Sequence, residues 1–294
     1  MPSTAEEWEP LGGIGQSAQR ALHVIEVLSI LGPSRLGDLA REAGLHKSTA
    51  HHFLRVLQNC GYVVQSPTTQ AYRLTLKLFE VGYRVVASTG LRERSLPFME
   101  RLMHETGETV WLVMLDQGEA VRVEKIESHA VMRLSEAMGT RVPLHATAAG
   151  KAILAGNWPA RWRQLLRPHM LPDGSLPTLT EHTITNIDAL QEQCESIRER
   201  GYAVDDEESS AGIRAVAAPI ADFAGDVSAA VSVAAPSFRL PRERLPEFGR
   251  TVAQHAREIE TMAEQPPTRT RATIWNQPRT TRGASSGPGV LYRA

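Results

Sequence analysis

Apolar residues in the first quarter of the chain repeat three times at helical spacing and then alternate as they do in strands. Glycines end each helical pattern, and the turn-forming sequence Ser-Pro-Thr-Thr-Gln separates the two alternating stretches. Ser34 is placed to cap the second helix at its N-terminus. The expected helices cover residues 18–31, 34–43 and the segment between Gly44 and Gly61, and the expected strands cover residues 62–65 and 71–74. This order predicts a winged helix-turn-helix.

The third of these helices divides into a polar and an apolar side. On a helical wheel its polar residues fall within an arc of roughly 140°, opposite Phe53, Leu54 and Leu57. A solvated surface explains such a side as well as nucleic acid does, so the order of elements decides for nucleic acid. The candidate DNA-contacting residues are Lys47, Ser48, Thr49, His51, His52 and Arg55 on the helix, with Thr69 and Arg73 on the hairpin.

Beyond residue 109 the pattern changes to strands mixed with helices. Strands are expected over residues 109–116, 120–127, 131–136, 202–204, 215–220 and 227–234, and helices over 148–154, 160–166, 186–200 and 241–262. Two helical segments within residues 74–105 precede them and are expected to space two domains. Mostly antiparallel strands combined with helices predict an α+β domain of the sensor type.

Composition restricts the class of protein. With 42% hydrophobic and 22% charged residues, the 294-residue chain has the composition of a globular protein. No apolar run reaches the length of a membrane span, and the N-terminus is acidic where a secretory signal is basic, so we expect a cytoplasmic location. The two cysteines, Cys60 and Cys194, are too few for a disulfide framework or a metal cluster, and we expect both to be buried.

Charge is distributed unevenly along the chain. Residues 14–80 contain seven Lys/Arg and four Asp/Glu, whereas residues 181–210 contain nine acidic and two basic residues. Residues 1–15 and 265–294 lack helical or strand periodicity, and we expect both to be disordered. The second of these segments carries five arginines and no acidic residue, which would give it weak, non-specific attraction to DNA.

The sequence VPLHATAAGKAILA, residues 142–155, is a candidate ligand-binding element. Its small residues Ala148, Ala149 and Gly150 lie at the expected start of a helix, where free backbone N–H groups favour an anion such as a carboxylate. Tight helix packing is an alternative role for these residues. Lys151 resembles the lysine of a phosphate-binding loop, but the glycine spacing of that motif is missing, so nucleotide hydrolysis is not expected.

A second candidate element is the acidic run from Asp205 to Glu208, followed by a strand that carries Ser228 and Ser232 on one face. Four successive acids between strands are typical of a solvated loop, although they could bind a cation or act as acid and base. No paired histidine or nucleophile supports catalysis. If the strand lines a pocket, the Ser232 hydroxyl can donate a hydrogen bond to a ligand.

Four stretches together resemble the IclR family of bacterial transcription regulators over about residues 16–262. They are GLHKSTAHHFLRVLQNCGYV, AYRLTLKLFEVG, VPLHATAAGKAILA and RGYAVDDEESSAGIRAVAAPIADFAGDVSAAVSV. The resemblance implies a winged helix-turn-helix, a linker helix and an effector-binding domain of GAF-like topology. It also implies dimers or tetramers that bind palindromic operators in double-stranded DNA and respond to small organic or aromatic acids.

The resemblance also implies positions for the effector. They are Ala148, Ala149, Gly150, Asp205, Ile213, Ala215, Ser232 and Ala234. The chain departs from the family where His46 stands for a frequent proline, His52 for a frequent arginine, and Ala215 and Ala234 for polar or cysteine residues of some members. The departures at Ala215 and Ala234 favour a larger or more apolar acid than a very small keto acid.

The sequence therefore predicts a transcription regulator, most specifically a repressor of a catabolic operon, with no catalytic residue, metal or cofactor. An enzyme that uses the acidic run and Ser232, and a regulator that responds to a protein partner, are the alternatives. The expected divisions are a disordered N-terminus (1–15), the DNA-binding domain (16–75), linker helices (76–106), the effector-binding domain (107–264) and a disordered basic tail (265–294).

Overall fold

The computed structural model describes residues 14–263 except residues 133, 135, 158, 160, 223 and 224. Both segments expected to be disordered fall outside this range, apart from residues 14 and 15. These two already belong to the first helix, so the expected boundary at residue 15 is too late. Among the described residues, no helix is both long and apolar enough to cross a membrane.

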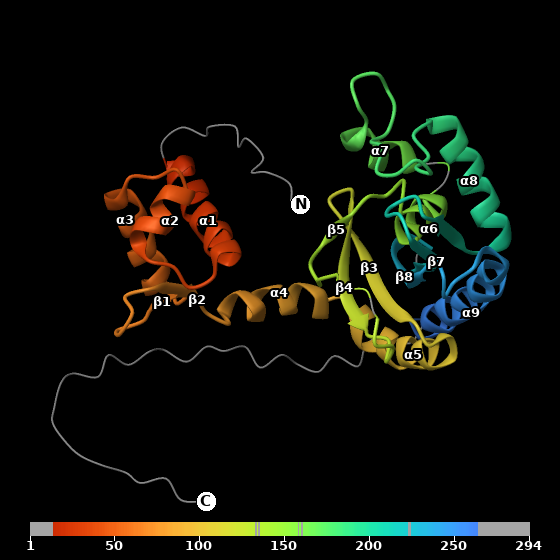
Figure 1. The fold of residues 1–294 in the computed structure, drawn as a ribbon, viewed down its shortest axis with the longest axis horizontal. Coiled ribbons are helices and arrows are strands. Elements are labelled where there is room, and N and C mark those ends of the chain that lie inside the picture. Colours follow the sequence, from red (N-terminus) through yellow and green to blue (C-terminus); the bar gives the residue numbers. More distant parts are fainter. Residues whose placement is uncertain are drawn as a thin grey trace, which may run out of the picture. The chain divides into compact units, whose positions relative to one another are not determined.

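Three helices and a short hairpin form the N-terminal part of the fold, as the periodicity predicts (Figure 1). They are α1 (Ile14–Leu31), α2 (Leu36–Glu42), α3 (Lys47–Asn59), β1 (Val63–Gln65) and β2 (Tyr72–Leu74). Their shared core includes Val24, Leu28, Leu39, Leu54 and Tyr72, each almost fully buried. Burial of these side chains holds the helices together, since packing of an apolar face supplies most of the stability of helices in proteins.

The start of α2 differs from the expectation. Arg35, not Ser34, occupies the N-cap position. Ser34 forms an isolated bridge with Tyr72 of the hairpin, and its hydroxyl donates to the Gly32 carbonyl over 3.1 Å. Cys60 also differs, because it follows the end of α3 as its C-cap residue and is exposed, whereas Cys194 is buried as expected.

Two helices connect this unit to the rest of the chain, α4 (Lys77–Ala87) and α5 (Leu91–Thr106). Gly90 separates them in a left-handed conformation, with φ of 62°. No residue of α4 is buried, although most of its circumference is apolar. The large exposed side chains on α4 or at its N-cap are Leu76, Phe79, Val81, Tyr83 and Val85.

A six-stranded sheet forms the centre of the C-terminal part, with the order β5-β4-β3-β8-β7-β6 and antiparallel neighbours throughout. The strands are β3 (Thr109–Asp116), β4 (Glu119–Ile126), β5 (Arg141–Val142), β6 (Ala203–Asp206), β7 (Ile213–Ala221) and β8 (Val227–Pro236). The helices are α6 (Ala148–Gly156), α7 (Trp162–Leu166), α8 (Ile187–Arg200) and α9 (Leu245–Ala263), with 3-10 turns η1 (Arg167–His169) and η2 (Arg242–Arg244).

Helices cover both faces of this sheet, so that it has two hydrophobic cores (Figure 1). On one face, α5 and α9 pack against Val110, Leu112 and Val216. On the other face, α6 packs against the strands and α7 and α8 pack against α6, in a core that includes Trp111 and Ala217. The alternation of side chains along each strand separates the two sets of residues, as it must in a sheet that is buried on both sides.

The expected strand over residues 131–136 is wrong. Its described residues form no strand, and β5 at Arg141–Val142 pairs with β4 instead. A two-residue strand carries no periodicity from which it could be predicted.

Candidate nucleic-acid interface and effector site

The polar side of α3 is free in the structure, as expected. Lys47, Ser48, His51, His52 and Arg55 are exposed, and Thr49 is half-buried. The opposite side of the helix is buried through Ala50, Phe53, Leu54 and Leu57. This packing turns the cationic side outwards and holds it on a rigid element.

The polar side of α3 carries two cations. Within the described residues, neither Lys47 nor Arg55 makes an ion pair, so neither charge is neutralised. On the hairpin, Thr69 and Arg73 are exposed as well. Unpaired cations on an exposed helix, together with a neighbouring hairpin, match the requirements for contact with phosphates and base edges.

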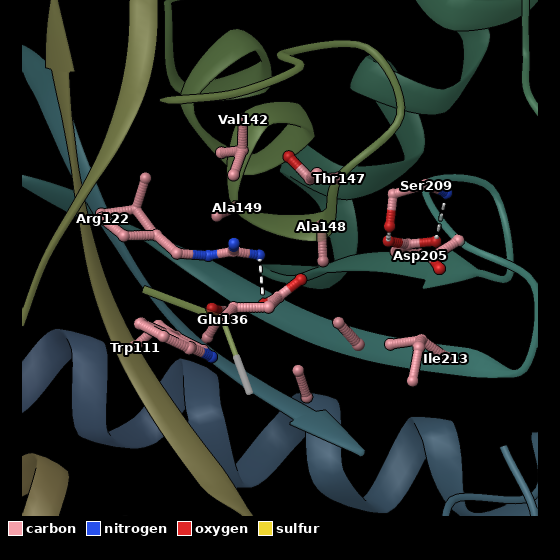
Figure 2. Close-up of a pocket in the computed structure, with 15 residues that line it drawn as sticks. Trp111, Arg122, Glu136, Val142, Thr147, Ala148, Ala149, Asp205, Ser209 and Ile213 are labelled. Atoms are coloured by element: carbon pink, nitrogen blue, oxygen red, sulfur yellow. Dashed lines mark hydrogen bonds and ion pairs between the residues drawn. The ribbon is translucent and has the colours of Figure 1, made fainter. Parts of the chain in front are cut away.

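A small cavity lies between the start of α6 and the sheet (Figure 2). Seven of the eight predicted effector positions line it, and they are Ala148, Ala149, Asp205, Ile213, Ala215, Ser232 and Ala234. The other lining residues are Trp111, Val113, Arg122, Glu136, Val142, Thr147, Ser209 and Ser210. The expected positions therefore converge on one site.

Strand register brings these residues together. Asp205 on β6 pairs with Ala215 on β7, which pairs with Ala234 on β8. One step along the sheet, Ser232 of β8 pairs with Trp111 of β3. Directly paired residues share a face of the sheet, so four strands contribute side chains to the same floor.

The start of α6 forms the opposite wall. Thr147 caps the helix, since its hydroxyl accepts a hydrogen bond from the Gly150 amide over 3.1 Å and donates to the Pro143 carbonyl. The amides of Ala148 and Ala149 have no acceptor among the described residues. The cavity therefore faces two free N–H groups at the positive end of a helix dipole.

Gly150 does not line the cavity, in contrast to the expectation. Its amide is bound by Thr147 and is not available to a ligand. A Cβ atom at this position would lie 2.5 Å from both the Cα and the carbonyl oxygen of Leu144. Gly150 thus allows close backbone packing, which was the alternative role for the small residues of this segment.

The acidic run is not a solvated loop at its two ends. Asp205 is 2% exposed and Glu208 is 7% exposed. Glu208 makes an ion pair with Lys151, which is completely buried in α6. The lysine that resembles a phosphate-binding residue is therefore bound to a carboxylate of the chain itself. Only Asp206 and Glu207, which bind Arg214, remain partly exposed within the run.

Asp205 accepts three hydrogen bonds at the edge of the cavity. The amides of Glu208 and Ser209 donate to Oδ1 over 2.8 and 3.2 Å, and the Ser209 hydroxyl donates to Oδ2. Burial nevertheless raises the pKa of Asp205 to about 6, against the lowering effects of Ser209 and the Lys151 charge. The site thus contains a carboxyl group that exchanges a proton near neutral pH.

This shift predicts a pH dependence of stability. Because burial raises the pKa of Asp205 in the folded state above its ordinary value of 3.8, the folded protein gains stability as pH falls through 6. Compared with Asp205→Asn, which retains the oxygen that accepts both amides, the wild type should gain about 1–1.5 kcal/mol in free energy of unfolding between pH 8 and pH 5, since pH 5 is still above the unfolded pKa. Urea unfolding at several pH values measures this difference. Asp188→Asn, at an exposed position, is the control, and an equal pH response of Asp205→Asn and wild type would contradict the assignment.

Sequence reasoning missed the charged pair in this cavity, Arg122 and Glu136. Arg122 Nη2 lies 2.6 Å from Glu136 Oε2, and the Arg122 guanidinium lies over the Trp111 ring at 4.8 Å from its centroid. Burial lowers the pKa of Arg122, and the ion pair opposes this shift. The strand itself carries no clear signal for Arg122, because it also contains Glu119, Glu124 and Lys125. No group of three or more His, Cys, Asp or Glu among the described residues is arranged to hold a metal.

Two family models match the chain. The model of the IclR helix-turn-helix domain matches residues 17–67, and that of the bacterial transcriptional regulator IclR C-terminal domain matches residues 83–261. The first range contains α3 and its exposed cations, and the second contains every residue that lines the cavity.

Similar proteins carry the same pair of regions. The HTH-type transcriptional regulator BhcR of Paracoccus denitrificans is 35% identical over 85% of this chain and 88% of its own length. The transcriptional repressor IclR of Escherichia coli is 34% identical over 85% of this chain and 90% of its own. An IclR homologue of Microbacterium hydrocarbonoxydans, crystallised with 4-hydroxybenzoate, has a TM-score of 0.72 at 25% identity and covers 85% of this chain and 100% of its own.

These relatives are regulators, not enzymes, which disfavours catalysis by the acidic run and Ser232. The helix-turn-helix, the α+β domain and the matches along most of the chain all indicate the same class of protein. The chain belongs to the IclR family of transcriptional regulators, with a DNA-binding N-terminal domain and a C-terminal effector domain.

Proposed function

We propose that this regulator represses a catabolic operon and that a small organic or aromatic acid in the α6 cavity controls its binding to DNA. The observation that carries the proposal is the cavity itself, which combines two free helix amides with an arginine and a floor that includes the small side chains of Ala215 and Ala234. The relative crystallised with 4-hydroxybenzoate supports an acid as the ligand, and the relative named as a repressor supports repression. Because the protein acts on chromosomal DNA, we place it in the cytoplasm.

For DNA, we propose that α3 lies in the major groove of a palindromic operator and that the hairpin contacts the flanking backbone. The residues in contact are Lys47, Ser48, Thr49, His51, His52, Arg55, Thr69 and Arg73. For the effector, the lining residues predicted from the sequence make the contacts, except Gly150, whose role is to pack α6 against Leu144.

We propose a homodimer as the basic unit, formed through α4. An amphipathic helix without any buried residue is unusual in a monomer, because its apolar side stays in water. Phe79 and Tyr83 form a stacked aromatic pair on this helix, with ring centroids 5.9 Å apart. A second copy of the chain supplies the same apolar side in a symmetric contact. A tetramer would require a further surface.

Control by a ligand requires that the acid bind more tightly to one arrangement of the two DNA-binding domains than to the other. The acid binds the two arrangements with different free energies. This difference sets the upper limit for the change in DNA-binding free energy that the acid can produce. The domain divisions near residues 75 and 107 would then be the positions at which the arrangement changes.

The direct test is a mobility shift with DNA from upstream of its own gene and from neighbouring promoters, with and without a panel of small aromatic and aliphatic acids. The proposal predicts a specific complex whose midpoint one of these acids moves. A complex that no acid affects would point to the alternative of a protein partner. Absence of any specific complex would contradict the proposed function.

Lys47→Ala and Arg55→Ala should each weaken operator binding. An arginine that reads a base contributes about 1–3 kcal/mol, and a lysine on a phosphate contributes about one unit to the slope of log affinity against log salt. Fluorescence anisotropy at several salt concentrations measures both quantities. Arg20→Ala, on α1 outside the proposed interface, is the matched control. Unchanged affinity and salt slope in both α3 variants would remove α3 from the interface.

A further inference from the structure

The Arg122–Glu136 pair occupies the cavity in which we place the effector (Figure 2). The Arg122 side chain is 14% exposed, whereas that of Glu136 is 40% exposed. The arginine therefore belongs to the wall of the site, and its partner reaches it from the connection between β4 and β5. A carboxylate of the chain thus lies where an acidic ligand has to bind.

A β-bulge turns Arg122 into the cavity. Lys125 pairs with Trp111 and Glu124 with Leu112, but the register then shifts, and Arg122 pairs with Val113. Without the shift Arg122 would pair with Met114, on the opposite face of the sheet among the residues packed against α5 and α9. Bulges of this kind redirect single side chains, often beside binding sites.

Further donors surround this position. The indole Nε1 of Trp111, a residue 1% exposed that lines the cavity, has no acceptor among the described residues. The amides of Ala148 and Ala149 are also free. A buried donor without an acceptor costs free energy. The site therefore still has donors for a further anionic oxygen when Glu136 is bound to Arg122.

The cavity is too small for a ring while Glu136 lies in it. Its volume is about 40 Å³. An apolar cavity that accepts benzene measures about 150 Å³. Binding of an aromatic acid therefore requires a lining group to leave. Glu136 is half-exposed, and its carboxylate can move into water without a large desolvation cost.

We propose that Arg122 binds the carboxylate of the effector and that Glu136 is an internal anion which the effector displaces. This inference rests on the proposed function, since it concerns the same cavity. The ligand class is a monocarboxylic acid whose carboxylate forms a paired, charge-assisted contact with the guanidinium and whose body lies over the small side chains of β7 and β8. The concentration at which the regulator responds is then set by competition with Glu136.

The test uses the full chain with benzoate and acetate as charged probes and benzamide as an uncharged one, measured by isothermal titration calorimetry. Glu136→Ala removes the competing carboxylate and its volume, and it should bind benzoate or acetate at least about tenfold more tightly than the wild type does. Glu136→Gln removes the charge alone and should give a smaller gain. Glu119→Ala is the matched control, because Glu119 makes an ion pair of 2.6 Å with Arg141 outside this cavity.

Adding Arg122→Met to Glu136→Ala should remove most of the gain of the two acids, and benzamide, which profits only from the freed volume, should gain much less than benzoate. Three results would each overturn the inference: no gain for either acid in either Glu136 variant, an equal gain for benzamide, or an undiminished gain in the double variant. Thermal denaturation of each variant establishes that it is folded.

Mobility shifts with the same proteins separate this inference from the proposed function. If the wild type forms no specific DNA complex but the calorimetric pattern holds, the regulatory role fails and the anion site stands. If an acid moves the DNA-binding midpoint of the wild type and Glu136→Ala responds at the same concentration, the regulatory role stands and the displacement of Glu136 is wrong.

Discussion

Lys151→Met should lower the free energy of unfolding by about 3–5 kcal/mol. Lys151 is completely buried, and it is the ion-pair partner of Glu208, which is itself 7% exposed. Removing one member of a buried pair leaves the other as an uncompensated charge, and losses of this size follow. One oxygen of Glu208, Oε2, already lacks a hydrogen-bond partner in the described structure, so the carboxylate is incompletely satisfied even before the lysine is removed.

The loss should depend on pH in a defined direction. Burial already raises the pKa of Glu208, and loss of the Lys151 charge raises it further. A folded-state pKa above the unfolded value means that stability is present at low pH and is lost as pH rises through the folded pKa. The variant should therefore be closest to the wild type near pH 5 and furthest from it near pH 8.

Guanidinium unfolding of Lys151→Met, Glu208→Gln and the double variant completes this experiment. The double variant should be more stable than Lys151→Met alone, because the buried Glu208 carboxylate that lost its partner has been removed as well. Arg141→Met, which breaks a half-exposed ion pair with Glu119, is the control and should cost at most about 1 kcal/mol. A double variant no more stable than Lys151→Met would show that the lysine acts through packing alone.

Local patterns were sufficient to predict most of the elements. The helices around Val24, Leu39 and Leu54 follow from three- and four-residue spacing, and glycines with a left-handed backbone, such as Gly44 and Gly61, end two of them. These features depend on residues that are close in sequence. The start of α2 was predicted wrongly because a tertiary contact, Ser34 with Tyr72, replaced the expected cap.

The cavity could be predicted only in part. The family resemblance located Asp205, Ser232 and the start of α6, and these residues do line one site. Arg122 was missed because its direction depends on a shift of register between β3 and β4, which no pattern within one strand reveals.

Burial of the acidic run was missed for a similar reason. A run of four acids is usually solvated, but Glu208 meets Lys151, a residue 57 positions away in the sequence. The pattern of charges along the sequence does not show that Glu208 and Lys151 contact each other. Pairing of this kind, and the burial it allows, is a property of the folded chain.

Phe79→Glu combined with Val85→Glu should convert the proposed dimer into monomers. Phe79 is 66% exposed and Val85 is 67% exposed, so the change should alter the free energy of unfolding of one chain by no more than about 0.5 kcal/mol per position. Two carboxylates placed in a symmetric apolar contact would become four desolvated charges, a cost that such a contact cannot offset.

Loss of the dimer should affect DNA-binding affinity more strongly than the two substitutions affect the stability of one chain. A dimer that contacts two half-sites gains about 10²- to 10⁴-fold in affinity over one domain on one half-site, and the monomer loses that factor. Sedimentation velocity measures the oligomer, and anisotropy with full-site and half-site DNA measures the two affinities. Binding to the full site should fall while binding to the half-site is retained, because α3 is unchanged.

Arg84→Glu, on the polar side of α4, controls for added charge. A variant that stays dimeric would show that α4 is covered by something other than a second copy, and a monomer that still binds the full site as the wild type does would show that the two half-sites are not read together.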